Sequence, residues 1–220
     1  MTEAQSESQS TVMVRRDGET AIITLNCPSG NALDRVALAA LSRAVRQLAE
    51  EPPLGGVVLT GSGAAFCTGL SAPCVAALSE GGREDLARVV AALVDDIQAL
   101  ETAVVAAVNG AAHGFGLILS LAADVRLFAD VADAGFGLHD AAGEVLFPEL
   151  ALALLERELG PVAVRRLSLS DAPFPFAEAV SLGLAESLVP PAGLLAAASA
   201  RAQGLVAQPG FLALKSLLKG

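Results

Sequence analysis

Cysteine is scarce in this sequence, and the three residues present form no recognisable pattern. Cys27, Cys67 and Cys74 make neither an even set for disulfide bonds nor a CxxC pair for a metal ion. No other residues have the spacing of metal ligands. We therefore expect reduced thiols that are mostly packed in the interior, and no metal site.

Basic residues are also few. Fourteen lysines and arginines stand against 24 aspartates and glutamates, which gives a net charge of −10 at pH 7. This balance disfavours nonspecific binding to nucleic acids. A polyanionic ligand would need help from backbone dipoles or from a few placed cations.

Long uninterrupted apolar runs are missing as well. The longest, Val89–Val94 and Leu117–Ala123, end at aspartates well before the roughly 20 residues that cross a bilayer, so we expect no membrane-spanning helix. The first ten residues are polar and include Glu3 and Glu7, unlike a secretory signal. We expect a disordered tail over residues 1–12 and a cytoplasmic protein. The 53% content of hydrophobic residues fits either helices packed through small residues or an oligomer that hides an apolar face.

Strand-like and helix-like segments alternate along the first two thirds of the chain. β-branched runs predict strands at residues 21–25, 57–60, 104–108 and 125–129, and helical spacing of apolar residues predicts helices at 36–48 and 86–100. This alternation indicates an α/β domain with right-handed crossovers. Helices are expected beyond residue 148, at 149–159, 162–169, 176–182 and 194–206. We expect a single domain over residues 13–220, with its strand-containing core ending at about residue 147.

Two glycine-punctuated segments, Leu59–Ser71 and Ala106–Leu117, are the most informative part of the sequence. Each follows an apolar β-branched run and leads toward a helix-like stretch. A strand that turns into a helix through glycines leaves backbone N–H groups unpaired, and two such turns side by side can direct them at one oxyanion. Glycines of this kind also simply allow close packing. The presence of two matching segments favours the oxyanion interpretation.

Together with Ala122–Leu127 and Phe136–Asp140, these segments resemble the crotonase superfamily, also called the enoyl-CoA hydratase/isomerase family. The similarity runs from about Val14 to Lys215, with a shorter C-terminus than typical members have. The resemblance implies a crotonase-like spiral of ββα units followed by a helical C-terminal region. It also implies an enzyme of fatty acid metabolism that takes an acyl-CoA thioester as substrate, uses no cofactor and forms a homotrimer or hexamer.

The resemblance assigns the oxyanion donors to two backbone amides. In Phe66–Ser71 the donor corresponds to Leu70, and in the triplet Gly114–Gly116 it corresponds to Phe115. These N–H groups would stabilise the enolate that a thioester forms when its α-proton leaves, and losing one such donor typically lowers the rate about 100- to 1,000-fold.

The acid/base groups depart from the family pattern. Hydratases of the family use two glutamates, whose positions correspond here to Ile118 and Asp140. Hydration by two carboxylates is therefore disfavoured, because water addition needs one group to activate water and another to manage the α-proton. The segment is closer to the enoyl-CoA isomerase branch, in which one carboxylate moves a proton between the α and γ carbons. Asp140 is the predicted base, with Glu144 and His113 as alternatives.

Coenzyme contacts are also implied by the resemblance. They fall on Asn31, Ala32 and Leu33, on Thr68, Gly69, Leu70 and Ser71, and on Gly114 and Gly116. Lys215 and Lys219 either supply cations near a coenzyme phosphate or act as partners of a helix dipole.

Two other functions stay open at this point. The first alternative to the isomerase is a noncatalytic crotonase-like protein that binds an acyl thioester or a partner enzyme. The second is a thioester hydrolase or decarboxylase that uses the same oxyanion site, in which Asp140, Glu144 or His113 would assist.

Overall fold

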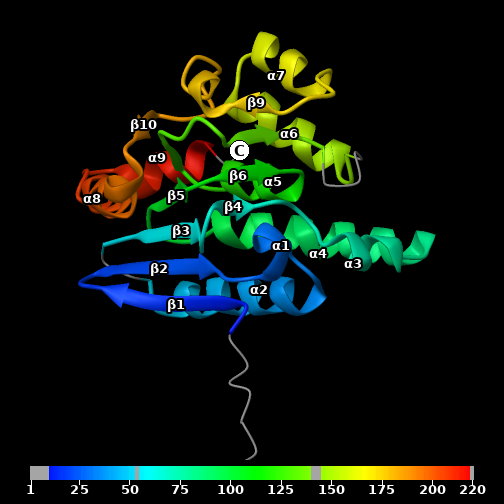
Figure 1. The fold of residues 1–220 in the computed structure, drawn as a ribbon. Coiled ribbons are helices and arrows are strands. Elements are labelled where there is room, and N and C mark those ends of the chain that lie inside the picture. The colour runs from blue at the N-terminus through cyan, green and yellow to red at the C-terminus, as the bar shows by residue number, and fades with distance from the viewer. Residues whose placement is uncertain (1–9, 53–54, 140–144, 219–220) are drawn as a thin grey trace, which may run out of the picture.

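The computed structural model describes residues 10–52, 55–139 and 145–218 of the chain (Figure 1). The strands are β1 (Val12–Asp17), β2 (Thr20–Leu25), β3 (Val57–Gly61), β4 (Ala65–Cys67), β5 (Val104–Val108), β6 (Ala111–His113), β7 (Val125–Ala129), β8 (Gly135–Gly137), β9 (Phe174–Pro175) and β10 (Ser187–Val189). The helices are α1 (Pro28–Asn31), α2 (Arg35–Glu50), α3 (Ala72–Ala76), α4 (Glu80–Gln98), α5 (Phe115–Leu121), α6 (Pro148–Glu158), α7 (Pro161–Ser168), α8 (Leu194–Val206) and α9 (Phe211–Leu218), with 3₁₀ turns η1 (Phe176–Glu178) and η2 (Pro191–Gly193).

A ββα unit repeats along the chain. The larger sheet has six strands in the order β1-β2-β3-β5-β7-β10, and the smaller sheet has four in the order β4-β6-β8-β9. Both strands of the first unit, β1 and β2, lie in the larger sheet, whereas in the later units the first strand joins the larger sheet and the second joins the smaller one. Apart from the antiparallel pairs β1–β2 and β8–β9, neighbouring strands are parallel. The repeat carries the chain from the N-terminal hairpin at one end of the molecule to α7 at the other (Figure 1), which confirms the predicted α/β fold of ββα units.

The central strands of the large sheet are buried on both faces. Side chains such as Ile22, Val58 and Val105 pack against α8, whereas their neighbours belong to the main core with α2 and α4. A strand covered on both sides needs apolar residues at every position. This explains why Val57–Leu59 of β3 and the whole of β5 are continuous hydrophobic runs, from which strands at residues 57–60 and 104–108 were predicted.

One predicted helix is wrong. Residues 176–182 form only the short turn η1, followed by further turns. The amides of Leu184 and Ala185 both bond to the Ala179 carbonyl, at 2.9 and 3.1 Å, and Gly183 adopts the left-handed φ of 74°. A residue in that conformation ends a helix. The apolar residues in this stretch are therefore spaced as in a helix but belong to a series of compact turns.

No helix in the described part of the chain combines the length and the apolar character needed to cross a membrane.

Helix α9 is fastened to the sheet by a buried ion pair. The Lys215 Nζ lies 2.7 Å from the Asp124 carboxylate and 2.7 Å from the Thr102 carbonyl oxygen. Asp124 also accepts a hydrogen bond from the Val104 amide at 2.8 Å. Burial lowers the pKa of Lys215, and the adjacent Asp124 carboxylate opposes that shift. Lys215 is 5% exposed, so it anchors α9 instead of offering a cation to a phosphate.

Replacing Lys215 by methionine is expected to lower the free energy of unfolding by about 3 kcal/mol, because the Asp124 carboxylate would stay partly buried without its cation. The double variant Lys215→Met, Asp124→Asn is expected to recover most of this loss. Urea denaturation measures both. The control Arg15→Met removes the cation of an exposed pair with Asp17 and is expected to change stability by no more than about 0.5 kcal/mol. An equal effect of Lys215→Met and Arg15→Met would contradict the anchoring role.

Candidate active site

The two glycine segments lie side by side in the smaller sheet. β4 follows the first turn, at residues 61–64, and β6 leads into the second turn, at residues 113–116. The two strands pair in parallel with Ala65 opposite Ala111. β8 then pairs with β6, which places Gly137 opposite His113. The structure thus brings β4, β6 and β8 side by side, although together they span about 70 residues of the sequence.

Two asparagines hold the first turn in place. The buried Asn31, at a φ of 61°, donates to the Ser62 and Ala65 carbonyls at 3.0 and 2.8 Å and accepts from the Cys27 amide at 3.0 Å. Asn109 donates to the same Ala65 carbonyl at 3.2 Å and accepts from the Gly61 amide at 3.0 Å. Both side chains are therefore occupied by the protein.

Asn109 was not singled out from the sequence. Its position directly after an apolar run and before Gly110 was the available signal, because asparagine side chains commonly bond to nearby backbone groups in turns.

The segments predicted to contact the coenzyme meet at one place. Leu33 and Leu70 form an isolated parallel bridge, in which the Leu33 amide donates to the Gly69 carbonyl and the Ser71 amide donates to the Leu33 carbonyl, both at 2.9 Å. The Thr68 hydroxyl donates to the Ser29 carbonyl at 2.9 Å. Residues 31–33 and 68–71 are therefore hydrogen-bonded to one another, and the Asn31 side chain serves the first turn.

The second turn depends on two glycines. Gly114 has a φ of 52° and a ψ of −122° and donates to the Gly137 carbonyl at 2.9 Å. At Gly116 a Cβ atom would lie 1.9 Å from the Cys67 carbonyl oxygen. Only glycine fits such an approach of helix α5 to strand β4, and this contact fixes the second turn against β4.

Two backbone amides beside these turns have no hydrogen-bond acceptor among the described residues. Phe115 is the first residue of α5, so its N–H has no partner within the helix. The bridge between Leu33 and Leu70 uses the amides of Leu33 and Ser71 and leaves that of Leu70 unused. These are the two amides that the sequence resemblance assigns to the oxyanion.

The side chains at these positions are apolar and buried. Leu70, Phe115 and Ile118 are each 2% exposed, and the Phe115 ring packs edge-on against Phe147 with 6.3 Å between the ring centroids. Ile118, at the position that the sequence resemblance assigns to a carboxylate of hydratases, thus places a hydrocarbon in the core. Asp140 and Glu144 lie outside the described residues.

Neither a reactive cysteine nor a metal site is found among the described residues near these turns. Burial raises the pKa of Cys67 to about 12, so its thiol stays protonated at neutral pH and is a poor nucleophile. No group of histidine, cysteine and carboxylate side chains suited to a metal ion occurs in the ranges that the structure describes.

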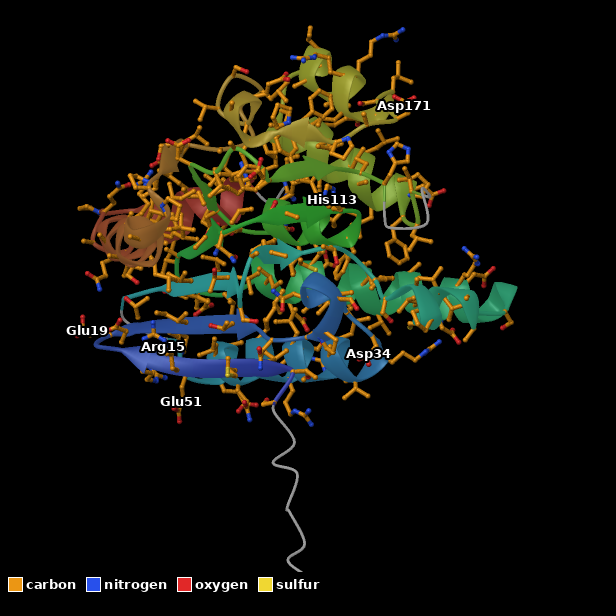
Figure 2. The ribbon with its side chains drawn as sticks, viewed as in Figure 1. Arg15, Glu19, Asp34, Glu51, His113 and Asp171 are labelled. Carbon is orange, nitrogen blue, oxygen red and sulfur yellow. The ribbon has the colours of Figure 1, made fainter. Side chains whose placement is uncertain are left out.

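His113 is the titratable side chain closest to the second turn in sequence. It lies near the middle of the molecule, whereas Arg15, Glu19 and Glu51 lie toward the N-terminal end (Figure 2). Its ring occupies space beside β8, where a Cβ at Gly135 or Gly137 would lie 3.9 and 4.0 Å from ring atoms. Burial lowers the pKa of His113, so the imidazole is neutral at pH 7 and able to accept a proton.

This lowered pKa predicts a pH dependence of stability. Because the folded chain binds a proton at His113 less readily than the unfolded chain, stability is complete above the ordinary value of 6.5 and falls as pH drops through it toward the lowered pKa. The variant His113→Gln is expected to lose less stability than the wild type between about pH 7 and pH 5. Urea denaturation at both pH values measures this, with His139→Gln as the control for removing one histidine. An unchanged slope in His113→Gln would contradict the prediction.

Comparison with known proteins agrees with this geometry. The sequence matches the enoyl-CoA hydratase/isomerase family over residues 15–219. The chain belongs to that family. It is 36% identical over 183 residues to EchA14 of Mycobacterium tuberculosis, which is named a probable enoyl-CoA hydratase. The aligned residues cover 79% of this chain and 68% of EchA14.

Solved structures of other proteins share the fold. A Pseudomonas aeruginosa protein, PA4980, superposes with a TM-score of 0.85 at 32% identity, covering 96% of this chain and 92% of that one. A monofunctional enoyl-CoA isomerase from M. smegmatis superposes with a TM-score of 0.77 at 28% identity, covering 96% and 94%. The crotonase fold and membership of an acyl-CoA-processing enzyme family are thus established.

Proposed function

We propose that the chain is an enoyl-CoA isomerase, which moves a proton between the α and γ carbons of a 3-enoyl-CoA thioester. Two observations support the proposal. The amides of Leu70 and Phe115, in the segments that follow the paired strands β4 and β6, have no acceptor among the described residues, and the buried Ile118 stands at the position that the resemblance assigns to a carboxylate of hydratases. An oxyanion site with one base suffices for isomerisation but not for two-carboxylate hydration.

The proposed reaction needs one oxyanion site and one base. The thioester oxygen accepts hydrogen bonds from the amides of Leu70 and Phe115. Asp140 removes the α-proton, and the electron pair moves into an enolate that the two amides stabilise. The double bond shifts, and Asp140 returns the same proton to the γ carbon, so that neither water nor a second acid is consumed.

Strand β8 supports the choice of Asp140. This strand pairs with β6 beside the second turn, and Leu138 and His139 lead from it to Asp140. His113 and Glu144 are the alternative bases. His113 is half-buried and neutral at pH 7, and it directly precedes Gly114.

The names of similar proteins include both hydratases and an isomerase. The M. tuberculosis relative is named a probable hydratase, whereas the M. smegmatis structure is titled a monofunctional isomerase. The apolar Ile118 favours the isomerase for this chain, because a side chain that cannot exchange protons cannot replace the missing carboxylate.

Liquid chromatography with mass spectrometry of a panel of acyl-CoA thioesters tests the proposal. A 3-enoyl-CoA is expected to give a 2-enoyl-CoA, which has the same mass and is recognised by its own retention time and by the absorbance of its conjugated enoyl thioester. A product heavier by one water would indicate hydration, and release of free coenzyme A would indicate a hydrolase; either outcome would overturn the isomerase. Binding without any conversion would favour the noncatalytic alternative.

Asp140→Asn identifies the base in the same assay. Isomerisation is expected to fall about 100-fold or more while acyl-CoA binding persists, because the amide cannot accept the proton. Glu144→Gln is the matched control, in which turnover is expected to stay near the wild-type value. The reverse pattern would assign the base to Glu144, and loss in neither variant would direct attention to His113.

A further inference from the structure

Strands β4 and β6, which lie beside the two glycine turns, do not pair in a regular register. Ala65 is opposite Ala111, but Cys67, two residues later, is opposite Ala112. Between these pairs β4 therefore has one residue more than β6, and that residue is Phe66. A β-bulge of this kind bends one strand against its partner, and bulges are frequent next to active sites.

The bulge brings the two proposed oxyanion donors level with one another. Leu70 and Phe115 each lie three residues beyond the paired residues Cys67 and Ala112. If the earlier register continued without the bulge, Leu70 would be level with Gly116 instead. Because a shift of one residue reverses the direction in which each residue of a strand points, the relative placement of the two amides depends on the register of β4 and β6.

Asn109 holds β4 just before the bulge. This half-buried residue follows β5 and comes two residues before β6. Its side-chain NH₂ group donates to the Gly63 and Ala65 carbonyls at 3.0 and 3.2 Å, and its side-chain oxygen accepts from the Gly61 amide at 3.0 Å. One side chain of the second glycine segment thus bonds to three backbone groups of the first.

The backbone beside Asn109 is also in close contact with the first segment. A Cβ atom at Gly110 would lie 1.9 Å from the Ala64 carbonyl oxygen and 3.0 Å from the Ala65 Cα atom. Asn31 bonds to the Ala65 carbonyl as well, but it comes from α1, outside both glycine segments. Asn109 is therefore the asparagine whose hydrogen bonds join one segment to the other.

We propose that Asn109 is a positioning residue of the oxyanion site, an inference that rests on the function proposed above. Asn109 fixes the register of β4 and β6 before the bulge and thereby sets the separation of the Leu70 and Phe115 amides. It needs no contact with the thioester for this role, because its side-chain groups are engaged by the first segment. Its loss is expected to lower kcat and to leave the affinity for acyl-CoA nearly unchanged.

Asn109→Asp tests this role with the least change of shape. A carboxylate still accepts from the Gly61 amide, but it cannot donate, so it loses both donated bonds and faces the Gly63 and Ala65 carbonyl oxygens. The kcat for 3-enoyl-CoA isomerisation is expected to fall about 100-fold, as for a misplacement of about 1 Å at a catalytic group. Asn109→Ala removes the same bonds without adding a charge and is expected to behave alike. A fall in Asn109→Asp alone would indicate an effect of charge and overturn the positioning role.

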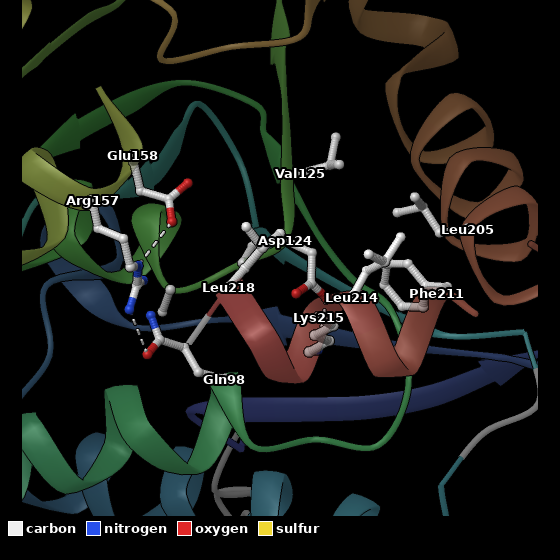
Figure 3. Close-up of a pocket in the computed structure, with 12 residues that line it drawn as sticks. Gln98, Asp124, Val125, Arg157, Glu158, Leu205, Phe211, Leu214, Lys215 and Leu218 are labelled. Atoms are coloured by element: carbon white, nitrogen blue, oxygen red, sulfur yellow. Dashed lines mark hydrogen bonds and ion pairs between the residues drawn. The ribbon is translucent and has the colours of Figure 1, made fainter. Parts of the chain in front are cut away.

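Lys215→Met is the matched control for lost stability. The amide of Val104, the first residue of β5, donates to Asp124, whose carboxylate lies beside Lys215 of α9 (Figure 3). This ion pair holds β5 at its amino end, whereas Asn109 follows its carboxyl end. Lys215→Met is expected to lower the melting temperature at least as much as Asn109→Asp and to leave kcat unchanged. An equal loss of kcat in the two variants would show that Asn109 acts only through overall stability.

The carbonyl stretching frequency of bound butyryl-CoA separates the role of Asn109 from the proposed function. This thioester has no double bond to move, and hydrogen bonds from the two amides polarise its carbonyl and lower the frequency. Raman spectroscopy is expected to show this lowering in the wild type and less of it in Asn109→Asp. No lowering in the wild type would overturn the oxyanion site and the role of Asn109 with it. An equal lowering in both proteins would overturn only the role of Asn109.

Discussion

Gly116→Ala is expected to abolish measurable turnover and to lower the free energy of unfolding by about 3 kcal/mol or more. The added Cβ would lie 1.9 Å from the Cys67 carbonyl oxygen and 2.7 Å from its carbonyl carbon. Both are backbone atoms of β4, so no flexible side chain can move aside, and α5 must separate from the strand.

This separation would also disturb the two proposed donors. Phe115 directly precedes Gly116, and Leu70 lies three residues beyond Cys67. A misplacement of about 1 Å at a catalytic group lowers rates about 100-fold. Turnover of a 3-enoyl-CoA and urea denaturation measure the two effects.

Gly204→Ala is the matched control. Gly204 lies within α8, and a Cβ there would meet nothing within 4 Å. Alanine at this position is expected to raise stability by about 0.5–1 kcal/mol through its better helix propensity and to leave turnover unchanged. Wild-type stability and turnover in Gly116→Ala would contradict the close approach of α5 to β4.

The second large effect is expected from Phe115→Pro compared with Phe115→Ala. Both variants lose the ring that packs on Phe147, but only proline lacks the backbone N–H. Proline is well tolerated at the first position of a helix, where its fixed φ suits the backbone and its missing N–H has no helical partner. The comparison therefore isolates the proposed oxyanion donor.

Turnover of Phe115→Pro is expected to be about 100- to 1,000-fold below that of Phe115→Ala, at similar acyl-CoA affinity. Steady-state kinetics and calorimetric binding measure the two quantities. Equal turnover of the two variants would show that this amide does not act on the thioester.

The sequence predicted those elements whose formation depends on burial of long apolar runs. The strands at residues 104–108 and 125–129 and the helix at 194–206 agree residue for residue with β5, β7 and α8. Such segments can be recognised without reference to their neighbours in the fold. Every position of β5 is buried, so it forms a continuous apolar run, whereas α8 buries about one residue per helical turn.

Short strands could not be predicted in the same way. β4, β6 and β8 have three residues each, too few for a periodic pattern, and they form because the ββα repeat places them next to one another. β1, at Val12–Asp17, was missed for a different reason: only its first residue is buried, so it offers no alternation of apolar and polar residues.

In the candidate site, too, local sequence features were predictable and tertiary contacts were not. Glycines and their spacing indicated both turns, but the contacts that hold the turns are tertiary. Nothing local to Lys215 identifies Asp124 as its partner 91 residues away, and nothing near Asn31 reveals that its amide bonds to Ala65 instead of a ligand. Long-range partners of this kind depend on the folded topology.

The central claim is that the Phe115 amide stabilises the oxyanion, and replacing this amide by an ester tests it most directly. Phenyllactate at position 115 keeps the aromatic side chain and exchanges only the N–H for oxygen. The same replacement at Phe211, whose amide donates to the Gln208 carbonyl at 3.2 Å away from the site, is the control. The ester at position 115 is expected to lower kcat for 3-enoyl-CoA isomerisation about 100-fold or more, and the ester at position 211 is expected to change it little. Equal kcat values for the two esters would contradict the role of the Phe115 amide.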